Sequence, residues 1–204
     1  LMEITKWAIK KTRIKNIYFS GGVAQNSLAM TKIAKIPEIS SFTVPPSPSD
    51  SGAAMGAAHF GYYVNNKKFL YSAPLFFTNN FDFPKTDNFL NLFNEVSKSE
   101  QSYKKVAELI SKGEIICIFD GGSETGPRSL GNRSIICSAK RYDVVNTLNN
   151  KIKGRESFRP LAPVILEKKI NEYFYVNKNY EHNLLWMGLT VDAKQETIKY
   201  YKGC

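Results

Sequence analysis

The stretch at residues 121–135 reads GGSETGPRSLGNRSI, and it determines how the neighbouring chain can fold. It follows the apolar run EIICIFD at residues 114–120, which predicts a strand. The stretch holds four glycines and one proline, so we expect a loop without regular structure. Arg128 and Arg133 lie on this loop together with one acid, Glu124.

A second polar cluster, KGRESFRP, follows at residues 153–160 and contributes Lys153, Arg155 and Arg159. Glycine N–H groups can approach a ligand closely, and the planar guanidinium group can bind two phosphate oxygens at once. The two clusters therefore favour a pocket for a small phosphorylated anion. A surface loop with salt-bridged arginines explains the same residues equally well.

Three segments of the chain resemble those of a known family. They are SGGVAQNSLAMTKI at residues 20–33, VPPSPSDSGAAMGAA at residues 44–58, and EIICIFDGGSETGPRSLGNRSIICSAKRYDVVNTLNNKIKGRESFRPLAPVILEKKINEYF at residues 114–174. Together they resemble the NodU-type O-carbamoyltransferases, in the order in which that family carries them. The resemblance is weakest between residues 64 and 97.

The resemblance implies an α/β fold divided between two domains, which the 204 residues are long enough to form. Residues 1–64 would be the C-terminal portion of an actin-like domain, and residues 65–97 a linker. Residues 98–204 would be the N-terminal portion of a YrdC-like domain. We expect a fragment of a longer protein, with exposed apolar patches where the missing parts of its own chain would dock.

The order of periodic segments and glycine turns also indicates an α/β arrangement. Helices are expected at residues 1–13, 24–36, 51–64, 99–111, 141–150 and 167–174. Strands are expected at residues 16–20, 41–44, 114–120, 162–166 and 184–191.

In the first domain, the resemblance implies a nucleotide-binding site for ATP at Gly21, Gly22 and Asn26. A glycine turn between strand and helix can hold phosphate oxygens, although by itself it fits a plain tight turn. Asp50 matches a metal ligand, usually for Fe(II), with Mg²⁺ as the other divalent candidate. The family pairs that aspartate with two histidines of an HxxxH helix, which would precede Leu1, so this chain supplies one ligand at most. Without the resemblance, Asp50 is better explained as a helix N-cap.

In the second domain, Arg128 and Arg159 match arginines that hold carbamoyl phosphate, and we assign both as catalytic. Glu124 would either orient an arginine or meet the substrate. Many relatives carry arginine where this chain has Gly122, so one positive charge is missing here or is supplied elsewhere. Further candidates for carbamoyl phosphate binding are Asn132, Arg133, Lys153 and Arg155.

The resemblance implies a transferase that joins carbamoyl phosphate and ATP into a carbamoyl adenylate. The carbamoyl group would then move to a hydroxyl acceptor on a sugar or natural product. This chemistry needs clamped phosphates and excluded water more than a covalent nucleophile. Two alternatives are a threonylcarbamoyl-adenylate-type YrdC-like module and a basic RNA-binding module, which the net charge of +10 allows. The chain lacks the aromatic–basic interleaving of many RNA-binding motifs, which disfavours nucleic acid.

Composition places further bounds on the protein. Hydrophobic residues make up 43% of the chain and aromatic residues 13%, which is enough for a packed core. Cys117 and Cys137 lie in apolar runs, so we expect buried thiols in a reducing cytoplasm. No apolar run is long enough to cross a bilayer, so we expect a cytoplasmic protein without a membrane partner. His59 is expected to be structural and His182 to be exposed on a loop.

Overall fold

The computed structural model describes residues 1–69, 76–77 and 102–201. The chain divides into two compact units, each assembled from separate stretches of sequence. Unit 1 comprises Leu1–Phe76, Glu124–Leu130 and Ala162–Tyr200, and unit 2 comprises Phe77–Ser123, Gly131–Leu161 and Tyr201–Cys204. The expected linker at residues 65–97 lies mostly outside the described residues, so the linear domain boundaries stay a prediction.

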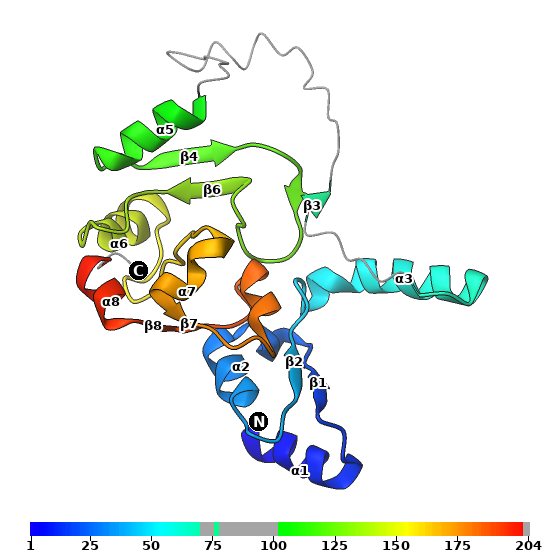
Figure 1. Cartoon of the computed structure of the whole chain (residues 1–204). Helices are drawn as coiled ribbons and strands as arrows, with labels where there is room; N and C mark the ends of the chain where they lie inside the picture. The colour runs from blue at the N-terminus through cyan, green and yellow to red at the C-terminus, as the bar shows by residue number, and fades with distance from the viewer. Residues whose placement is uncertain (70–75, 78–101, 202–204) are drawn as a thin grey trace. The chain divides into compact units, whose positions relative to one another are not determined.

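Unit 1 combines helices with two small sheets (Figure 1). Its helices are α1 (Met2–Thr12), η1 (Gly22–Gln25), α2 (Ser27–Ala34), η2 (Asp50–Gly52), α3 (Ala53–Asn66), η4 (Glu167–Lys169), α7 (Ile170–Tyr173), η5 (Glu181–Trp186) and α8 (Gln195–Tyr200). Its strands are β1 (Asn16–Tyr18) and β2 (Ser41–Thr43), which pair in parallel, and β7 (Phe174–Tyr175) and β8 (Asp192–Ala193), which pair antiparallel.

Unit 2 consists of α5 (Ser102–Ser111), β4 (Ile116–Phe119), β6 (Arg133–Ile136), α6 (Val144–Asn146) and a π-helix, η3 (Thr147–Ile152). Strands β4 and β6 pair antiparallel, with Phe119 opposite Arg133. Two further strands of two residues each, β3 (Phe76–Phe77) and β5 (Ser123–Glu124), occur where the sequence passes between the units. The mixture of helices and small sheets confirms the predicted α/β character.

The hydrophobic core of unit 1 is built on β1, β2 and α2. The parallel pairing sets Ile17 opposite Phe42, and the Phe42 side chain is completely buried. On α2, Met30 and Ile33 are likewise buried, three positions apart on one helix face. Leu189, from the distant third stretch of unit 1, belongs to the same cluster.

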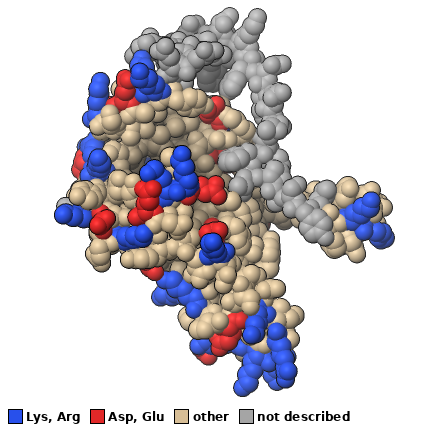
Figure 2. All heavy atoms as spheres, in the orientation of Figure 1, with Lys and Arg blue, Asp and Glu red and all other residues tan. Residues whose placement is uncertain are grey.

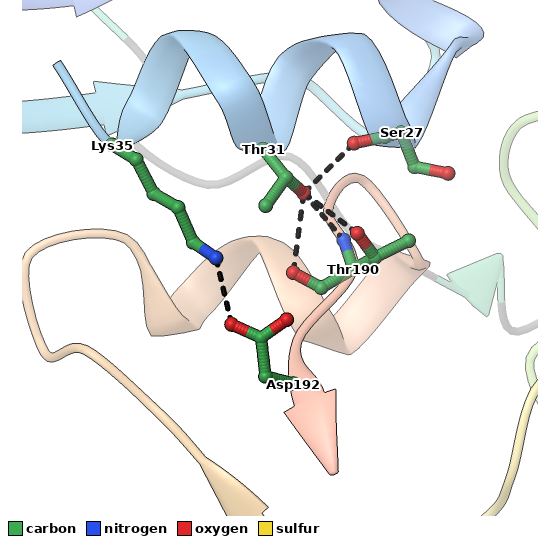
Figure 3. Close-up of polar contacts among 5 residues, drawn as sticks. All are labelled: Ser27, Thr31, Lys35, Thr190 and Asp192. Atoms are coloured by element: carbon green, nitrogen blue, oxygen red, sulfur yellow. Dashed lines mark hydrogen bonds and ion pairs between the residues drawn. The ribbon is translucent and has the colours of Figure 1, made fainter.

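Polar contacts attach this distant stretch to α2 (Figure 3). The Thr31 hydroxyl accepts a hydrogen bond from the backbone N–H of Thr190 at 2.8 Å and lies 2.8 Å from the carbonyl oxygen of Ser27. One turn further along, Lys35 Nζ forms an ion pair with Asp192 Oδ2 at 2.7 Å. The face of α2 that carries these side chains therefore holds residues 190–192 in place.

A buried amide makes the second attachment, to β2. The side chain of Asn183 has no exposed surface, and its Oδ1 accepts a hydrogen bond from Val44 N at 2.7 Å. Its Nδ2 donates to the carbonyl oxygens of Phe42 and Tyr180, both at 2.8 Å. The amide thus satisfies backbone groups at the end of β2 that would otherwise be buried without partners.

The surface of unit 1 includes a basic region and uncovered apolar side chains. Figure 2 shows lysine and arginine side chains gathered over the C-terminal end of α1, whose last turn carries Lys10 and Lys11. On the same helix Ile4 and Trp7 are 67% and 62% exposed, and no residue of α3 is buried. That these surfaces dock other parts of a longer chain stays a prediction.

Several expected elements differ from those observed. Residues 162–166 form no strand, because Pro163 lacks the N–H that a ladder needs. The strand expected at residues 184–191 is replaced by η5, after which Met187 adopts a left-handed conformation (φ 57°) that a strand cannot include. The stretch expected to be a loop, residues 121–135, contains β5 and the start of β6. In β6, Arg133 and Ile135 pair with Phe119 and Cys117 of β4.

Smaller corrections concern single side chains. Cys117 is exposed because burial alternates along β4, and Cys137, just after the end of β6, is only half-buried. Burial raises the pKa of the Cys137 thiol. His182 is half-buried and lies within hydrogen-bond distance of Thr43 Oγ1, at 3.0 Å, so it is not a free loop residue. Among the described residues, no helix is long and apolar enough to span a membrane.

Candidate functional site

In unit 1 the glycine turn is tied to the proline-rich segment that precedes Asp50. Gly21 has a φ of 101°, which favours glycine, and its N–H donates to Pro48 O at 2.6 Å. The Ser20 hydroxyl donates to the same carbonyl at 2.9 Å. The predicted nucleotide-binding turn and the predicted metal-ligand segment are therefore neighbours within unit 1.

The strap formed by residues 124–130 carries Arg128 into this region. A Cβ at Gly126 would lie 2.3 Å from Pro46 O, so only glycine allows the strap to approach the proline segment this closely. Glu124 Oε1 accepts a hydrogen bond from Leu130 N at 2.6 Å and closes the strap. Arg128 Nη2 donates to Gln25 O at 3.0 Å. Arg128 thus belongs to the glycine-turn region, and Glu124 shapes the backbone that bears it.

A shallow pocket with about 240 Å³ of solvent-open space lies where these segments meet. Its lining includes the Arg128 side chain, which is exposed, and Trp186, whose indole N–H donates to Val44 O at 2.8 Å. The other lining residues are Ala24, Gln25, Val44, Pro45, Pro46, Pro48, Pro127, Met187 and Gly188. The lining thus consists of proline and other uncharged residues with one guanidinium group, that of Arg128.

Asp50 is exposed, and its carboxylate forms no hydrogen bond or ion pair with the described residues. Neither Ser49 nor Asp50 caps the following helix, so the expected capping role is wrong. The Ser49 hydroxyl instead lies 2.5 Å from Gln25 Nε2, which donates to it. In the part of the chain that the structure describes, no three His, Cys, Asp or Glu side chains gather as a metal site. The assignment of Asp50 as one ligand of a metal stays a prediction.

The side chain of Asn26 makes a local hydrogen bond within unit 1. Its Oδ1 accepts a hydrogen bond from Ala29 N at 3.0 Å and so caps the N-terminus of α2. N-capping of α2 therefore explains the side chain of Asn26 without a ligand. A contact between this side chain and a nucleotide would have to use its Nδ2 group.

In unit 2, Arg133 stabilises the turn that follows β4. Its Nη1 donates to the carbonyl oxygens of Asp120 and Asn132 at 2.6 and 3.0 Å, and its Nη2 donates to Gly121 O at 3.2 Å. The guanidinium carbon lies 3.7 Å from the ring centre of Phe119. Both Nη groups of Arg133 therefore donate hydrogen bonds to backbone carbonyl groups.

The same turn has two further supports. Asn132 Nδ2 donates to Gly122 O at 2.9 Å, which fits the turn-supporting role considered for it. The Tyr103 hydroxyl donates to the Asp120 carboxylate, and the Gly121 N–H donates to its other oxygen at 2.8 Å. The bond from Tyr103 and then that from Gly121 lower the pKa of Asp120.

The second arginine cluster is organised around an amide that we did not select from the sequence. The side chain of Asn149 is completely buried, and its Oδ1 accepts a hydrogen bond from Arg155 Nε at 2.7 Å. Its Nδ2 donates to the carbonyl oxygens of Ser157 and Arg159 at 3.2 and 2.9 Å. The only hint in the sequence is that Asn149 directly follows Leu148 on the inward-facing side of the helix.

Arg159 has its own acidic partner in this cluster. Its Nε donates to Glu156 Oε2 at 2.7 Å, where both side chains are about half exposed. A backbone N–H, then the charge of Arg159, lower the pKa of Glu156. Lys153 is exposed and leaves its ammonium group without a hydrogen bond to the described residues.

The candidate residues thus form separate groups. In unit 2, Asn149 binds the side chain of Arg155 and the backbone carbonyl of Arg159, and the turn after β4 holds Asn132 and Arg133. Arg128 lies in unit 1 with the glycine turn, whereas Arg159 lies in unit 2. The expected convergence of Arg128 and Arg159 on one anion stays a prediction.

Comparison with known proteins identifies the family to which the chain belongs. Residues 107–202, which include the whole Asn149 cluster, match the family model described as Carbamoyltransferase C-terminus. An uncharacterized protein of Synechocystis is 29% identical over 194 residues, covering 90% of this chain and 31% of that relative. The chain is a member of the carbamoyltransferase family.

Named relatives narrow the family to the NodU type. Nodulation protein NolNO of Sinorhizobium fredii is 30% identical over 173 residues, covering 80% of this chain and 25% of the relative. Nodulation protein U of the same species is 30% identical over 165 residues, covering 78% of this chain and 27% of the relative. The chain spans about a third or less of the length of these relatives.

Proposed function

We propose that this chain is part of an O-carbamoyltransferase that uses carbamoyl phosphate and ATP. The observation that carries the proposal is the loop at residues 153–159, which lies inside the region matched by the family model. Arg155 and Arg159 are held on this loop through Nε, and neither uses an Nη group on a described residue. Two guanidinium ends presented from one loop suit a small dianion such as a phosphate monoester.

The proposed reaction has two stages. On a YrdC-like part, to which unit 2 contributes its arginines, water would cleave carbamoyl phosphate to carbamate and inorganic phosphate. The carbamate would then displace pyrophosphate from ATP to give a carbamoyl adenylate. On an actin-like part, the hydroxyl of a sugar or natural product would take the carbamoyl group, lose its proton and release AMP. In such a reaction the protein mainly orients the phosphates and stabilises charge that develops on their oxygens.

We further propose that ATP contacts the region of Gly21, Gly22 and Arg128 in unit 1. The lining of the pocket there includes both the exposed side chain of Arg128 and Trp186. Asp50, whose carboxylate makes no contact with the described residues, would contribute one ligand to a divalent metal ion. If that ion is Fe(II), it would act as a Lewis acid. The described residues do not complete such a site.

Calorimetric titration of the 204-residue chain with carbamoyl phosphate tests the anion site. Arg159→Lys keeps the positive charge but loses the fork, so we expect the dissociation constant to rise roughly 10- to 100-fold. Arg13→Lys, at the exposed C-cap of α1, makes the same chemical change away from the loop and should have no effect. Equal affinity of wild type and Arg159→Lys would refute the assignment of Arg159.

A further inference from the structure

Asn149 lies on the buried face of the π-helix η3. Lys153 N donates to Leu148 O at 2.8 Å, which spans five residues and opens the helix by one residue per turn. Val144 and Leu148 are buried on the inner face, and Asn149, the next residue, is buried beside them. An amide therefore occupies a position on the buried face, where an amphipathic helix usually carries an apolar side chain.

The amide of Asn149 is used almost completely. Its oxygen accepts from Arg155 Nε, and its nitrogen donates to the carbonyl oxygens of Ser157 and Arg159. The backbone carbonyl of Asn149 also accepts from Arg155 N at 2.9 Å. One residue therefore fixes the loop at three positions, including both arginines considered for carbamoyl phosphate.

The mode of attachment determines what the arginines present. A guanidinium held through Nε keeps both Nη groups at its far end, where they can bind two oxygens of one anion. Asn149 holds Arg155 in this way, and Glu156 holds Arg159 in the same way at 2.7 Å. Arg155 is only half exposed, so its orientation depends on the buried amide more than on solvent.

We propose that Asn149 is a positioning residue that sets the guanidinium groups of Arg155 and Arg159 for anion binding. The inference rests on the proposed carbamoyl phosphate site. It requires an amide specifically, because one end of the side chain must accept and the other must donate. An aspartate has the same shape, but when ionised it would direct an oxygen at the carbonyls of Ser157 and Arg159.

The test compares Asn149→Asp with Asn150→Asp in the 204-residue chain. Asn150 is the next residue of the same π-helix and is exposed, so it supplies the same change in charge without the contacts. Asn149→Asp should weaken carbamoyl phosphate binding roughly 10-fold or more, and Asn150→Asp less than about twofold. Asn149→Ser, which introduces no charge at the buried position, should weaken binding by an amount between these two. It also covers the case in which Asn149→Asp does not fold.

A spectroscopic signal separates positioning from loss of fold. In nuclear magnetic resonance spectra of wild type, the Arg155 Nε–H proton should exchange slowly with solvent. Its chemical shift should be altered by the hydrogen bond to Asn149. The shift should disappear in Asn149→Ser while the amide signals of β4 and β6 stay unchanged. Loss of dispersed signals throughout unit 2 would mean that Asn149 serves the fold only, and would overturn the inference.

A double-mutant cycle completes the experiment. If Asn149 acts through the arginines, adding Asn149→Ser to Arg159→Ala should weaken binding less than it does in wild type. Full additivity, or wild-type affinity in Asn149→Ser with its fold intact, would overturn the inference. No binding by wild type would instead refute the proposed carbamoyl phosphate site, and the Arg155 signal would then report on the contact alone.

Discussion

Replacing Asn183 with alanine should destabilise unit 1 strongly. The amide is completely buried and makes three hydrogen bonds, of 2.7 to 2.8 Å, to Val44 N, Phe42 O and Tyr180 O. Alanine would leave one buried N–H without a partner and would remove one bond from each of two carbonyl groups. A buried group left unsatisfied costs about 1 to 3 kcal/mol, and the orphaned N–H carries most of that cost.

Summed over the three groups, we expect a loss of about 3 to 5 kcal/mol from the free energy of unfolding. This is a large part of the stability of an ordinary domain, about 5 to 15 kcal/mol. For a chain of this size the melting temperature should fall by roughly 6 to 20 °C. Urea titration and thermal melting, each followed by far-ultraviolet circular dichroism, measure both quantities.

Asn179→Ala is the matched control, because Asn179 is exposed in the same stretch and its side chain makes no hydrogen bond to the described residues. It should change stability by less than about 0.5 kcal/mol. If Asn183→Ala stayed within about 1 kcal/mol of the control, the claim that this amide fastens residues 180–190 to β2 would be wrong.

Two further predictions concern the strap and the turn after β4. Gly126→Ala should cost about 1 to 3 kcal/mol, because φ is +93° and the new Cβ would meet Pro46 O, whereas Gly56→Ala on the open face of α3 should cost nothing measurable. Tyr103→Phe should lower stability at neutral pH by removing the hydrogen bond that lowers the pKa of Asp120 and raises that of Tyr103. A lowered carboxyl pKa stabilises the fold above the unfolded value of about 3.9, and a raised phenol pKa stabilises it below about 10. The difference between Tyr103→Phe and wild type in urea titrations should therefore shrink at about pH 3, below the unfolded carboxyl pKa; a difference that stays constant between that pH and neutrality would contradict the contact.

Local sequence signals determined much of the secondary structure. Val106, Leu109 and Ile110 are the half-buried face of α5, as their spacing predicted, and Val144 and Leu148 are buried as expected. The glycine turn at Gly21 also follows from sequence, since few other residues adopt its positive φ. These features depend on side-chain period and backbone sterics, which neighbouring residues set by themselves.

Tertiary structure alone decided where the distant stretches attach and which polar side chains organise them. Asn149 and Asn183 are the two completely buried polar side chains among the described residues, yet asparagine is most often found at the surface. The partners of Asn183 lie up to 141 positions away, so no local pattern predicts its burial, whereas those of Asn149 lie within ten positions. The arginine motifs were visible in the sequence as charge and spacing. Whether a given arginine binds the backbone, as Arg133 does, or presents a free fork, as Arg155 does, depends on which acceptors the fold brings beside it.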